Sequence, residues 1–484
     1  MDPKMRKNIV LYLGIFASVF VVTTFAFAAK PTPIPQLVIQ SVVVESNTLQ
    51  INGENLTNGN TLAVTLSGNT LTVITSSSTQ IVASFPPTTL AGTYKVTVVT
   101  GSASAQKGEF YVTIGAAGPP GPSHSYAGVT VVARSGGNYD NPLTAMESLS
   151  EWCGTPSNTN TCLLKIMPGE YDIGSNSLQM REFVDIEGSG ENTTVIKGNN
   201  DSSTTSGVVV GASNAEIRLL TIKNTGGGYY SIAFLNNSAS PKITNVTAIA
   251  FNSASTEENT AISNWNNSSP ILQNVTAIAT GTGKTNLSIR NDQSSPILIN
   301  VTSYALDAID NVGVLNGYSS PTMRNVAITV AGTGHENYGI YNVVSSNAVI
   351  TNTNISVSGN AENNAGIINN NSSSSIEGVR IVSIGGGNNY GISNFASSSL
   401  RVFNVTCSVS GGTNNYGIYN LGTNSTVRID NSVISSSAIT VNNSGGSAYI
   451  ANTKLDGAPV VNTGTLKCAG VYDGNYVFSP NTCP

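Results

Sequence analysis

Four residues of types that perform acid–base chemistry form two short groups in the second half of the chain. Asp307 and Asp310 lie in YALDAIDNVG, and His335 and Glu336 lie in GTGHENY. Carboxyl and imidazole groups serve as general acids and bases, and pairs of carboxyls cleave glycosidic bonds. In segments rich in Gly and Asn, such residues are more often solvated turn residues. The four are therefore candidate catalytic residues, with a purely structural role as the alternative.

Both groups occupy equivalent places in an internal repeat. Seven segments share the apolar residue of a YGI-like step, and these residues recur every 25 to 27 positions: Ile262, Ile289, Val314, Ile340, Ile367, Ile392 and Ile418. An asparagine follows each of them two positions later: Asn264, Asn291, Asn316, Asn342, Asn369, Asn394 and Asn420. A second register, typified by SPILQNV, carries Asn245, Asn274, Asn300, Asn325, Asn352, Asn404 and Asn431, with Gly378 as the exception. The candidate acids precede the YGI-like step, as do Glu258 and Glu362, so we expect them along one edge of the fold.

A repeat of this length predicts stacked coils of short strands. Each strand would pair in parallel with its equivalent in the next coil, and inward Ile and Val would form a continuous core. Asparagines at one turn of every coil would hydrogen-bond as a ladder, since Asn tolerates left-handed geometry. The sequence therefore predicts an all-β fold, a right-handed parallel β-helix with coils stacking from about Leu219 to Leu455. A β-propeller is the alternative, but its blades need about 40 residues.

The segment ahead of the repeats predicts a cap for the N-terminal end of the β-helix. VTVVARSGGNYDNPLTAMESLSEW is typical of a strand, a turn and a helix, with Asn141 as N-cap and Pro142 as first helical residue. The apolar stripe of this helix is Leu143, Met146, Leu149 and Trp152. We expect the tail KCAGVYDGNYVFSPNTCP to cover the other end.

Three motifs in this entrance resemble the pectin-lyase-like superfamily, and pectin methylesterases in particular. They are Gly137-Asn138-Tyr139, Pro168-Gly169-Glu170-Tyr171 and the segment from Ile186 to Gly198. The resemblance implies a right-handed β-helix and, for many members, activity on acidic polysaccharides, with calcium in some lyases. The catalytic segments of pectin methylesterases (Q-D-T-L, D-F-I-F-G and G-R-P-W) and the N-T-D, D-D and G-H-G patterns of galacturonases are absent from Val208 onward.

Residues 36–114 form a separate all-β unit. IQSVVVES, LQINGENL, FPPTTLAGTYKVTVVT and EFYVTIG resemble the IPT/TIG family of immunoglobulin-like domains, which implies a β-sandwich with an accessory or binding role. Residues 115–125 include GAAGPPGPS, which predicts a stiff collagen-like linker, with a trimerisation stub as the alternative. The β-helix would then occupy residues 129–484.

Residues 1–28 are typical of a secretory signal. Lys4, Arg6 and Lys7 precede an apolar run, and Ala26-Phe27-Ala28 fits a small-x-small cleavage site. An uncleaved membrane anchor is the alternative. Cleavage would leave a net charge of −7 and no membrane span, so we expect a secreted or cell-surface protein, extracellular or periplasmic.

The five cysteines agree with an oxidising compartment. We expect disulfides between Cys153 and Cys162 and between Cys468 and Cys483, one near each end of the β-helix. Cys407 is left as a buried structural thiol, because no histidine is near it in the sequence.

Composition and motifs leave two hypotheses for the function. Charged residues make up only 10% of the chain, which excludes a basic nucleic-acid surface. The first hypothesis is a non-catalytic surface or carbohydrate-binding protein whose partner is a polysaccharide or cell-surface glycan. The alternative is a polysaccharide-active enzyme: a lyase, a hydrolase or a pectinesterase-like esterase. We expect no cofactor, except Ca²⁺ if the protein is a lyase. Oligomerisation, including a trimer, stays open.

Overall fold

The computed structural model describes residues 34–45, 47–86, 89, 92–114, 126–202, 206–226, 228–252 and 258–484. Contacts divide the chain into two compact units, Met1–Ser123 and His124–Pro484. The predicted signal segment 1–28 and the predicted linker 115–125 lie outside the described residues. Among the described residues, no helix is long and apolar enough to cross a membrane.

The first unit contains the predicted β-sandwich. Its two antiparallel sheets have the orders β1-β2-β6-β5 and β4-β3-β7-β8. Inward side chains such as Leu49, Ile51, Val96 and Val98 are fully buried between the sheets. The elements are β1 (Val38–Glu45), β2 (Thr48–Glu54), β3 (Ala63–Leu66), β4 (Asn69–Thr70), β5 (Thr72–Ser76), β6 (Gln80–Ser84), β7 (Gly92–Val99), the short 3-10 helix η1 (Ser104–Gln106) and β8 (Lys107–Ile114).

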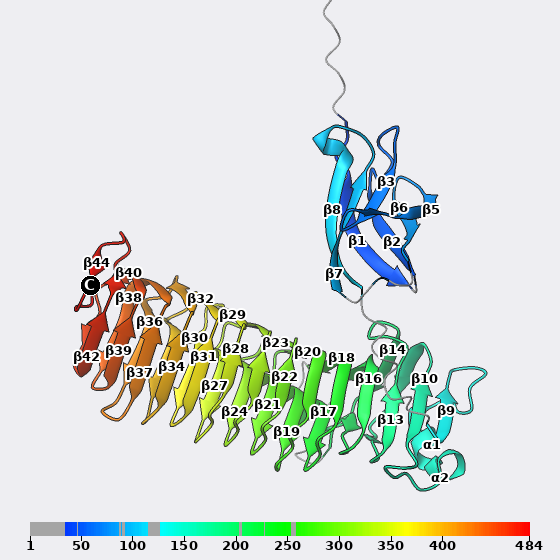
Figure 1. The fold of residues 1–484 in the computed structure, drawn as a ribbon. Coiled ribbons are helices and arrows are strands. Elements are labelled where there is room, and N and C mark those ends of the chain that lie inside the picture. The colour runs from blue at the N-terminus through cyan, green and yellow to red at the C-terminus, as the bar shows by residue number, and fades with distance from the viewer. Residues whose placement is uncertain are drawn as a thin grey trace, which may run out of the picture. The chain divides into compact units, whose positions relative to one another are not determined.

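The second unit is a parallel β-solenoid of about 11 turns, which confirms the predicted β-helix. Figure 1 shows its coils stacked in sequence order from cyan to red. Each coil adds one strand to each of three sheets, so every strand pairs in parallel with its equivalent in the next coil. Backbone groups are thereby paired between coils, and only the ends of the stack need covering.

The strands are grouped here by sheet. The first sheet contains β9 (Gly128–Val132), β10 (Cys162–Ile166), β13 (Val184–Glu187), β22 (Ile297–Ile299), β25 (Thr322–Arg324), β28 (Val349–Thr351), β31 (Ser373–Glu377), β34 (Ser399–Phe403), β37 (Thr426–Asp430), β39 (Ser447–Ala451) and β42 (Thr465–Ala469). The second sheet contains β11 (Gly169–Asp172), β14 (Thr194–Gly198), β23 (Thr302–Leu306), β26 (Ala327–Ala331), β29 (Asn354–Ser358), β32 (Arg380–Ile384), β35 (Thr406–Ser410), β40 (Lys454–Ala458) and β43 (Val471–Tyr472). Three strands run through both of these sheets: β16 (Glu216–Asn224), β18 (Lys242–Phe251) and β20 (Ile271–Thr280).

The third sheet carries the YGI-like steps. It contains β12 (Leu178–Gln179), β15 (Val209–Val210), β17 (Tyr230–Asn237), β19 (Glu258–Trp265), β21 (Thr285–Asp292), β24 (Asp310–Gly317), β27 (Glu336–Val343), β30 (Asn363–Asn370), β33 (Asn388–Phe395), β36 (Asn414–Leu421) and β41 (Val461–Asn462). The strand β38 (Val433–Ser444) joins the second sheet to the third, and β44 (Phe478–Ser479) pairs antiparallel with β43.

The coils begin earlier in the chain than the sequence predicts. β9 pairs in parallel with β10, and β10 pairs with β13, so stacking starts at Gly128 rather than near Leu219. The first coils are irregular in length because they contain α1 (Pro142–Glu147) and α2 (Leu149–Trp152), which hides them from a search for a fixed period. As predicted, Pro142 opens α1 and the Asn141 side chain accepts a hydrogen bond from the Leu143 N–H, at 2.8 Å.

Two separate sets of asparagines stabilise the stack, and they differ in position. Those of the YGI-like register lie inside third-sheet strands, fully buried, rather than at a turn as predicted. All of these amides except that of Asn369 donate to the next coil, for example Asn291 to Asn316 and Asn316 to Asn342, both at 2.8 Å. This ladder is interrupted between Asn369 and Asn394, where no hydrogen bond joins the two side chains.

The asparagines of the second register lie at the turn between the first and second sheets. Asn245, Asn274, Asn300, Asn325, Asn352, Asn404 and Asn431 all have φ between 47° and 56°, and Gly378 takes the same place at 64°. The left-handed conformation predicted for turn asparagines therefore belongs to this set, and its amides also form coil-to-coil hydrogen bonds.

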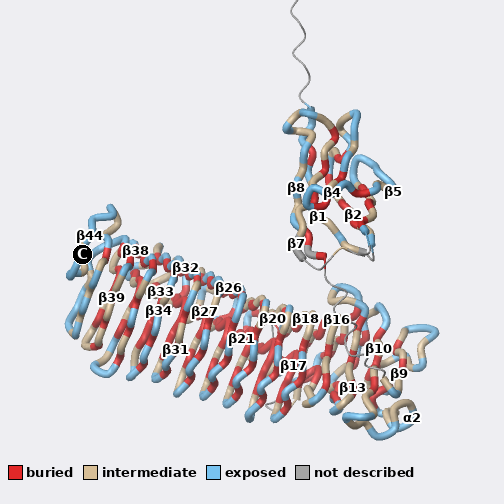
Figure 2. Tube along the Cα trace, viewed as in Figure 1, coloured by how far each residue is buried: buried red, intermediate tan, exposed pale blue. Residues whose placement is uncertain are grey.

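Apolar side chains fill the interior of the coils. The seven apolar residues of the YGI-like steps are fully buried in one core, and Figure 2 shows buried segments alternating with exposed ones along the strands. Both predicted disulfides, Cys153–Cys162 and Cys468–Cys483, are present. Cys407 is fully buried, and this burial raises the pKa of its thiol to about 12, which agrees with a structural role.

Candidate functional site

The outer face of the third sheet brings most of the candidate residues together. Asp310 is the first residue of β24 and Glu336 the first residue of β27, and the two are paired in register on adjacent coils. Glu258 continues the same column two coils earlier. The predicted acidic edge therefore exists along this column, although Asp307 does not belong to it. Asp307 is exposed in the preceding loop, where it accepts a hydrogen bond from Thr280.

Asp310, His335 and Glu336 form a small polar cluster. Nδ1 of His335 lies 4.0 Å from Oδ1 of Asp310, and that oxygen is buried without a hydrogen-bond partner among the described residues. Burial raises the pKa of Asp310, and the nearby His335 only partly offsets this effect. A carboxyl with a raised pKa can hold a proton nearer neutrality than an ordinary aspartate, as a general acid must.

A hollow lined by aromatic side chains adjoins this cluster. It has a volume of about 420 Å³ and runs over β27, β30, β33 and β36. We call it the aromatic trough, defined by Tyr338, Tyr341, Tyr390, Phe395 and Tyr419. Asn363, Asn370, Ser393 and Glu336 supply polar groups at its walls. The trough therefore offers ring faces together with hydrogen-bonding groups, on the outside of the β-helix.

The rings of the trough pack against one another. Tyr338 and Tyr341 meet edge to face with centroids 5.4 Å apart, and Tyr390 stacks on Tyr416 at 5.5 Å. Burial raises the pKa of the Tyr338 hydroxyl strongly and that of Tyr390 as well. An apolar cluster on this outer face is separate from the interior core. It contains Tyr338, Tyr341, Tyr390, Leu287, Val312 and Ile368. This packing holds the rings in place before any ligand binds.

A glycine in each coil of the aromatic trough hides this trough from a reading of the sequence by strand alternation. Strict alternation would place Tyr338 and Ile340, two positions apart, on the same side of β27. In the structure the ladder pairs both residues with β24 but passes over Gly339, so Tyr338 and Tyr341 both lie outside while Ile340 points inward. A Cβ on Gly339 would lie 2.4 Å from Ile355, so the strand needs glycine there. The feature of the sequence that could have indicated the aromatic trough is the tyrosine on both sides of the Gly-Ile step, as in YGIY at 338–341 and 416–419.

A second polar group on the same sheet is an ion pair, although the Nε of its arginine, Arg290, is buried without a hydrogen-bond partner among the described residues. Arg290 pairs with Glu258 at 3.1 Å, and its guanidinium carbon lies 4.0 Å from the centre of the Trp265 ring. This pairing accounts for Glu258, which we therefore separate from the candidate acids. Glu362 precedes β30 and lies next to the edge, but it makes no ion pair in the described part of the chain.

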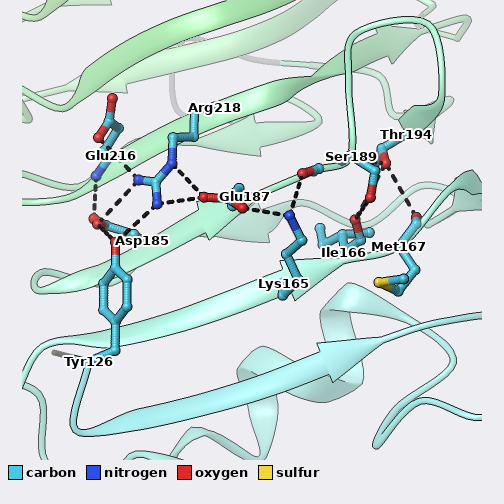
Figure 3. Close-up of polar contacts among 11 residues, drawn as sticks. Tyr126, Lys165, Ile166, Met167, Asp185, Glu187, Ser189, Thr194, Glu216 and Arg218 are labelled. Atoms are coloured by element: carbon cyan, nitrogen blue, oxygen red, sulfur yellow. Dashed lines mark hydrogen bonds and ion pairs between the residues drawn. The ribbon is translucent and has the colours of Figure 1, made fainter. Parts of the chain in front are cut away.

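The most connected ionic cluster lies in the first coils (Figure 3). Arg218 contacts Glu187 at 2.7 Å, Glu216 at 3.1 Å and Asp185 at 3.5 Å, and it donates to the Tyr126 hydroxyl at 3.0 Å. Burial acts to raise the pKa of Glu187, but hydrogen bonds from Lys165 and Arg218 lower it overall. Every charge here has a partner, so the cluster fastens the first coils together. Within the described residues, no group of three or more His, Cys, Asp or Glu side chains is placed to hold a metal ion.

The protein therefore belongs to the class of all-β proteins that combine an antiparallel β-sandwich with a parallel β-helix. The third sheet of the β-helix carries aromatic side chains on its outer face. Residues 37–114 match the IPT/TIG domain family, so this part of the chain is an IPT/TIG domain. No curated protein matches the chain.

Solved structures resemble the chain in fold. The A-module of a mannuronan C-5 epimerase from Azotobacter vinelandii is 15% identical with a TM-score of 0.47, over 67% of this chain and 91% of that one. Carrot pectin methylesterase is 12% identical with a TM-score of 0.34, over 53% and 83%. The pectate lyase Pel9A is 13% identical with a TM-score of 0.35, over 71% and 78%. The parallel β-helix that the entrance motifs imply is seen directly in the pairing of the coils.

Proposed function

We propose that this protein is a polysaccharide-active β-helix protein. The aromatic trough binds a glycan chain, and Asp310 and Glu336 supply acid–base chemistry at its margin. The observation that carries the proposal is the placement of a raised-pKa carboxyl, Asp310, one strand away from Glu336, which itself lines the aromatic trough.

The shape and chemistry of the trough support glycan binding. One face of a pyranose ring carries mainly C–H groups and stacks on aromatic rings, whereas its hydroxyls need hydrogen-bond partners. The trough supplies both, because tyrosine rings lie beside Asn363, Asn370 and Ser393. Its openness along four coils suits a chain that enters and leaves on either side.

The carboxyl pair supports chemistry on the bound chain. Adjacent strands lie about 4.8 Å apart, so the carboxyls of Asp310 and Glu336 can approach one bond of a ligand together. The raised pKa of Asp310 favours the protonated form of this carboxyl, which could donate a proton to the bound chain beside Glu336. This assignment favours the enzyme hypothesis over the non-catalytic one.

The test is a screen of the purified protein against pectin, polygalacturonate, alginate and neutral glucans, with and without calcium. Lyase products are read by ultraviolet absorbance, hydrolysis by reducing ends and de-esterification by methanol release. We expect turnover on at least one polymer, lost about 100-fold or more in Asp310→Asn and in Glu336→Gln. The matched control is Glu377→Gln, an exposed carboxyl on the first sheet.

The outcomes separate chemistry from binding. Turnover that survives in both variants would remove the carboxyl pair from the mechanism. Binding without turnover on any polymer would overturn the catalytic part and return the protein to the non-catalytic carbohydrate-binding hypothesis.

A further inference from the structure

A column of basic and aromatic side chains lies on the first sheet, near the C-terminal end. Arg401, Arg428, Tyr449 and Lys467 are paired in register on the neighbouring strands β34, β37, β39 and β42. These strands lie side by side in the orange and red part of Figure 1. Because adjacent strands are about 4.8 Å apart, the column presents cationic groups at regular intervals along the axis of the β-helix.

These charges are not compensated by the protein. Among the described residues, no carboxylate lies within ion-pair distance of Arg401, Arg428 or Lys467, and all three are exposed. Arg401 and Arg428 are directly opposite each other, an arrangement of like charges that destabilises a sheet. Arg218, on the same sheet at the other end, has three acidic partners (Figure 3). A chain with a net charge of −5 thus leaves one cationic column unpaired.

The column lines two adjoining hollows. One, of about 380 Å³, has a largely apolar floor and is lined by Arg401, Phe403, Arg428, Tyr449 and Lys467. Asp430 also lines it, and its carboxylate accepts a hydrogen bond from Asn452 rather than forming an ion pair with these cations. The other, of about 370 Å³, shares both arginines and continues over the serines of β31 toward earlier coils. The Arg428 guanidinium carbon lies 5.1 Å from the centre of the Tyr449 ring, which steadies both groups. The hollows together form a groove along the axis of the coils.

We propose that this basic groove binds an anionic polysaccharide, independently of the aromatic trough. Guanidinium groups pair bidentately with carboxylate or sulfate, and the rings of Phe403 and Tyr449 can contact the C–H faces of sugars. A single small anion would need convergent donors, whereas this column is spread over four coils. Its regular spacing fits a polymer whose acidic groups recur along the chain. The groove lies on the first sheet and shares no lining residue with the trough, so it is a second site.

The experiment measures binding of the full chain to dextran sulfate, polygalacturonate and neutral dextran. We expect both anionic polymers to bind and neutral dextran not to bind at this site; the stronger of the two identifies the preferred anion. Arg401→Gln combined with Arg428→Gln should weaken binding at least about tenfold. Raising the ionic strength from about 0.1 M to about 1 M, which shortens the Debye length from about 10 Å to about 3 Å, should weaken wild-type binding as well.

Controls keep the result specific. Arg380→Gln removes an equally exposed arginine from β32 of the second sheet and should bind as wild type does. Lys467→Gln tests the same groove with a single change, in case the double variant alters the coils. Unchanged affinity in the double and Lys467 variants would overturn the proposal. Equal affinity for single-stranded DNA would overturn it too, because the site would then recognise any polyanion rather than a sugar acid. Weaker binding of the anionic polysaccharides by the double and Lys467 variants than by the wild type, with weaker wild-type binding of DNA, supports the proposal. This holds whatever the outcome for the aromatic trough.

Discussion

At the scale of single residues, the environment of Asp310 distinguishes it from the other acidic residues in the repeats. Asp307 is exposed and bonded to Thr280, and Glu258 is neutralised by Arg290. Asp310 alone among them combines partial burial, an unpartnered oxygen and an imidazole at 4.0 Å. The sequence predicted a shared edge from the position of these residues in the repeat. It could not predict which carboxyl would be desolvated, since that depends on side chains from neighbouring coils.

The raised pKa of Asp310 predicts a pH dependence of stability. A carboxyl with a higher pKa in the folded state binds its proton more tightly when folded, so stability falls as pH rises from the unfolded value, near 3.8, through the folded pKa. Asp310→Asn cannot ionise and lacks this loss. We expect the wild type to lose stability relative to Asp310→Asn over this range, measured by denaturant unfolding at several pH values. A difference that does not change with pH would contradict the raised pKa.

At the scale of elements, the asparagines inside the third-sheet strands and those at the turn between the first and second sheets have different structural roles. Buried amides inside the strands need partners, because an unpaired polar group in the core is costly. Turn asparagines are chosen for their backbone conformation, and Gly378 shows that the side chain is dispensable at that place. Both sets have the same period, so the sequence predicts the repeat but not which asparagines are buried. The irregular pairing at Gly339 likewise cannot be predicted from the repeat period alone.

Asn316→Ala should destabilise the β-helix. Asn316 accepts a hydrogen bond from Asn291 and donates one to Asn342, so the substitution leaves one buried donor and one buried acceptor unpaired. We expect a loss of roughly 1–3 kcal/mol for each group left without a partner, measured by denaturant unfolding. A loss below the error of the measurement would show that the ladder contributes nothing beyond packing.

For the asparagines at the turn between the first and second sheets, the contribution to stability depends on backbone conformation instead. Asn325 has φ of 56° and an exposed side chain. Asn325→Gly keeps this conformation accessible and should cost a few tenths of a kcal/mol, whereas Asn325→Ala should cost about 1 kcal/mol or more. Thermal unfolding of the two variants provides the comparison. If alanine were tolerated as well as glycine, the hydrogen bond rather than the conformation would explain the asparagine.

At the scale of the whole molecule, each coil contacts only its neighbours, so the ends of the stack are its weakest points. The sequence predicted the period, the capping helix and both disulfides, because these depend on local patterns. The aromatic trough and the basic groove arise only when strands of successive coils are superposed in register. The paired residues are 18 to 27 positions apart, and the register was known only from the structure.

Removal of the Cys468–Cys483 bridge should loosen the C-terminal coils selectively. The bridge closes a loop with a sequence separation of 15, for which loop entropy predicts about 3 kcal/mol of stabilisation. With both cysteines changed to serine, we expect faster hydrogen exchange in β40 to β44 and unchanged protection in β17 to β21. Uniformly faster exchange along the β-helix would show that the coils unfold as one unit.

The most direct measurement of the central claim is the affinity of a bound glycan for the wild type and for Tyr390→Leu, which keeps apolar bulk but removes the stacking ring. The ligand is the polymer with the highest affinity in the screen, and Tyr304→Leu, on β23 of the second sheet, is the control. We predict that Tyr390→Leu binds about tenfold more weakly, in line with the loss of one aromatic contact, while Tyr304→Leu binds normally. Equal affinity of all three proteins would place the glycan elsewhere and contradict the role assigned to the aromatic trough.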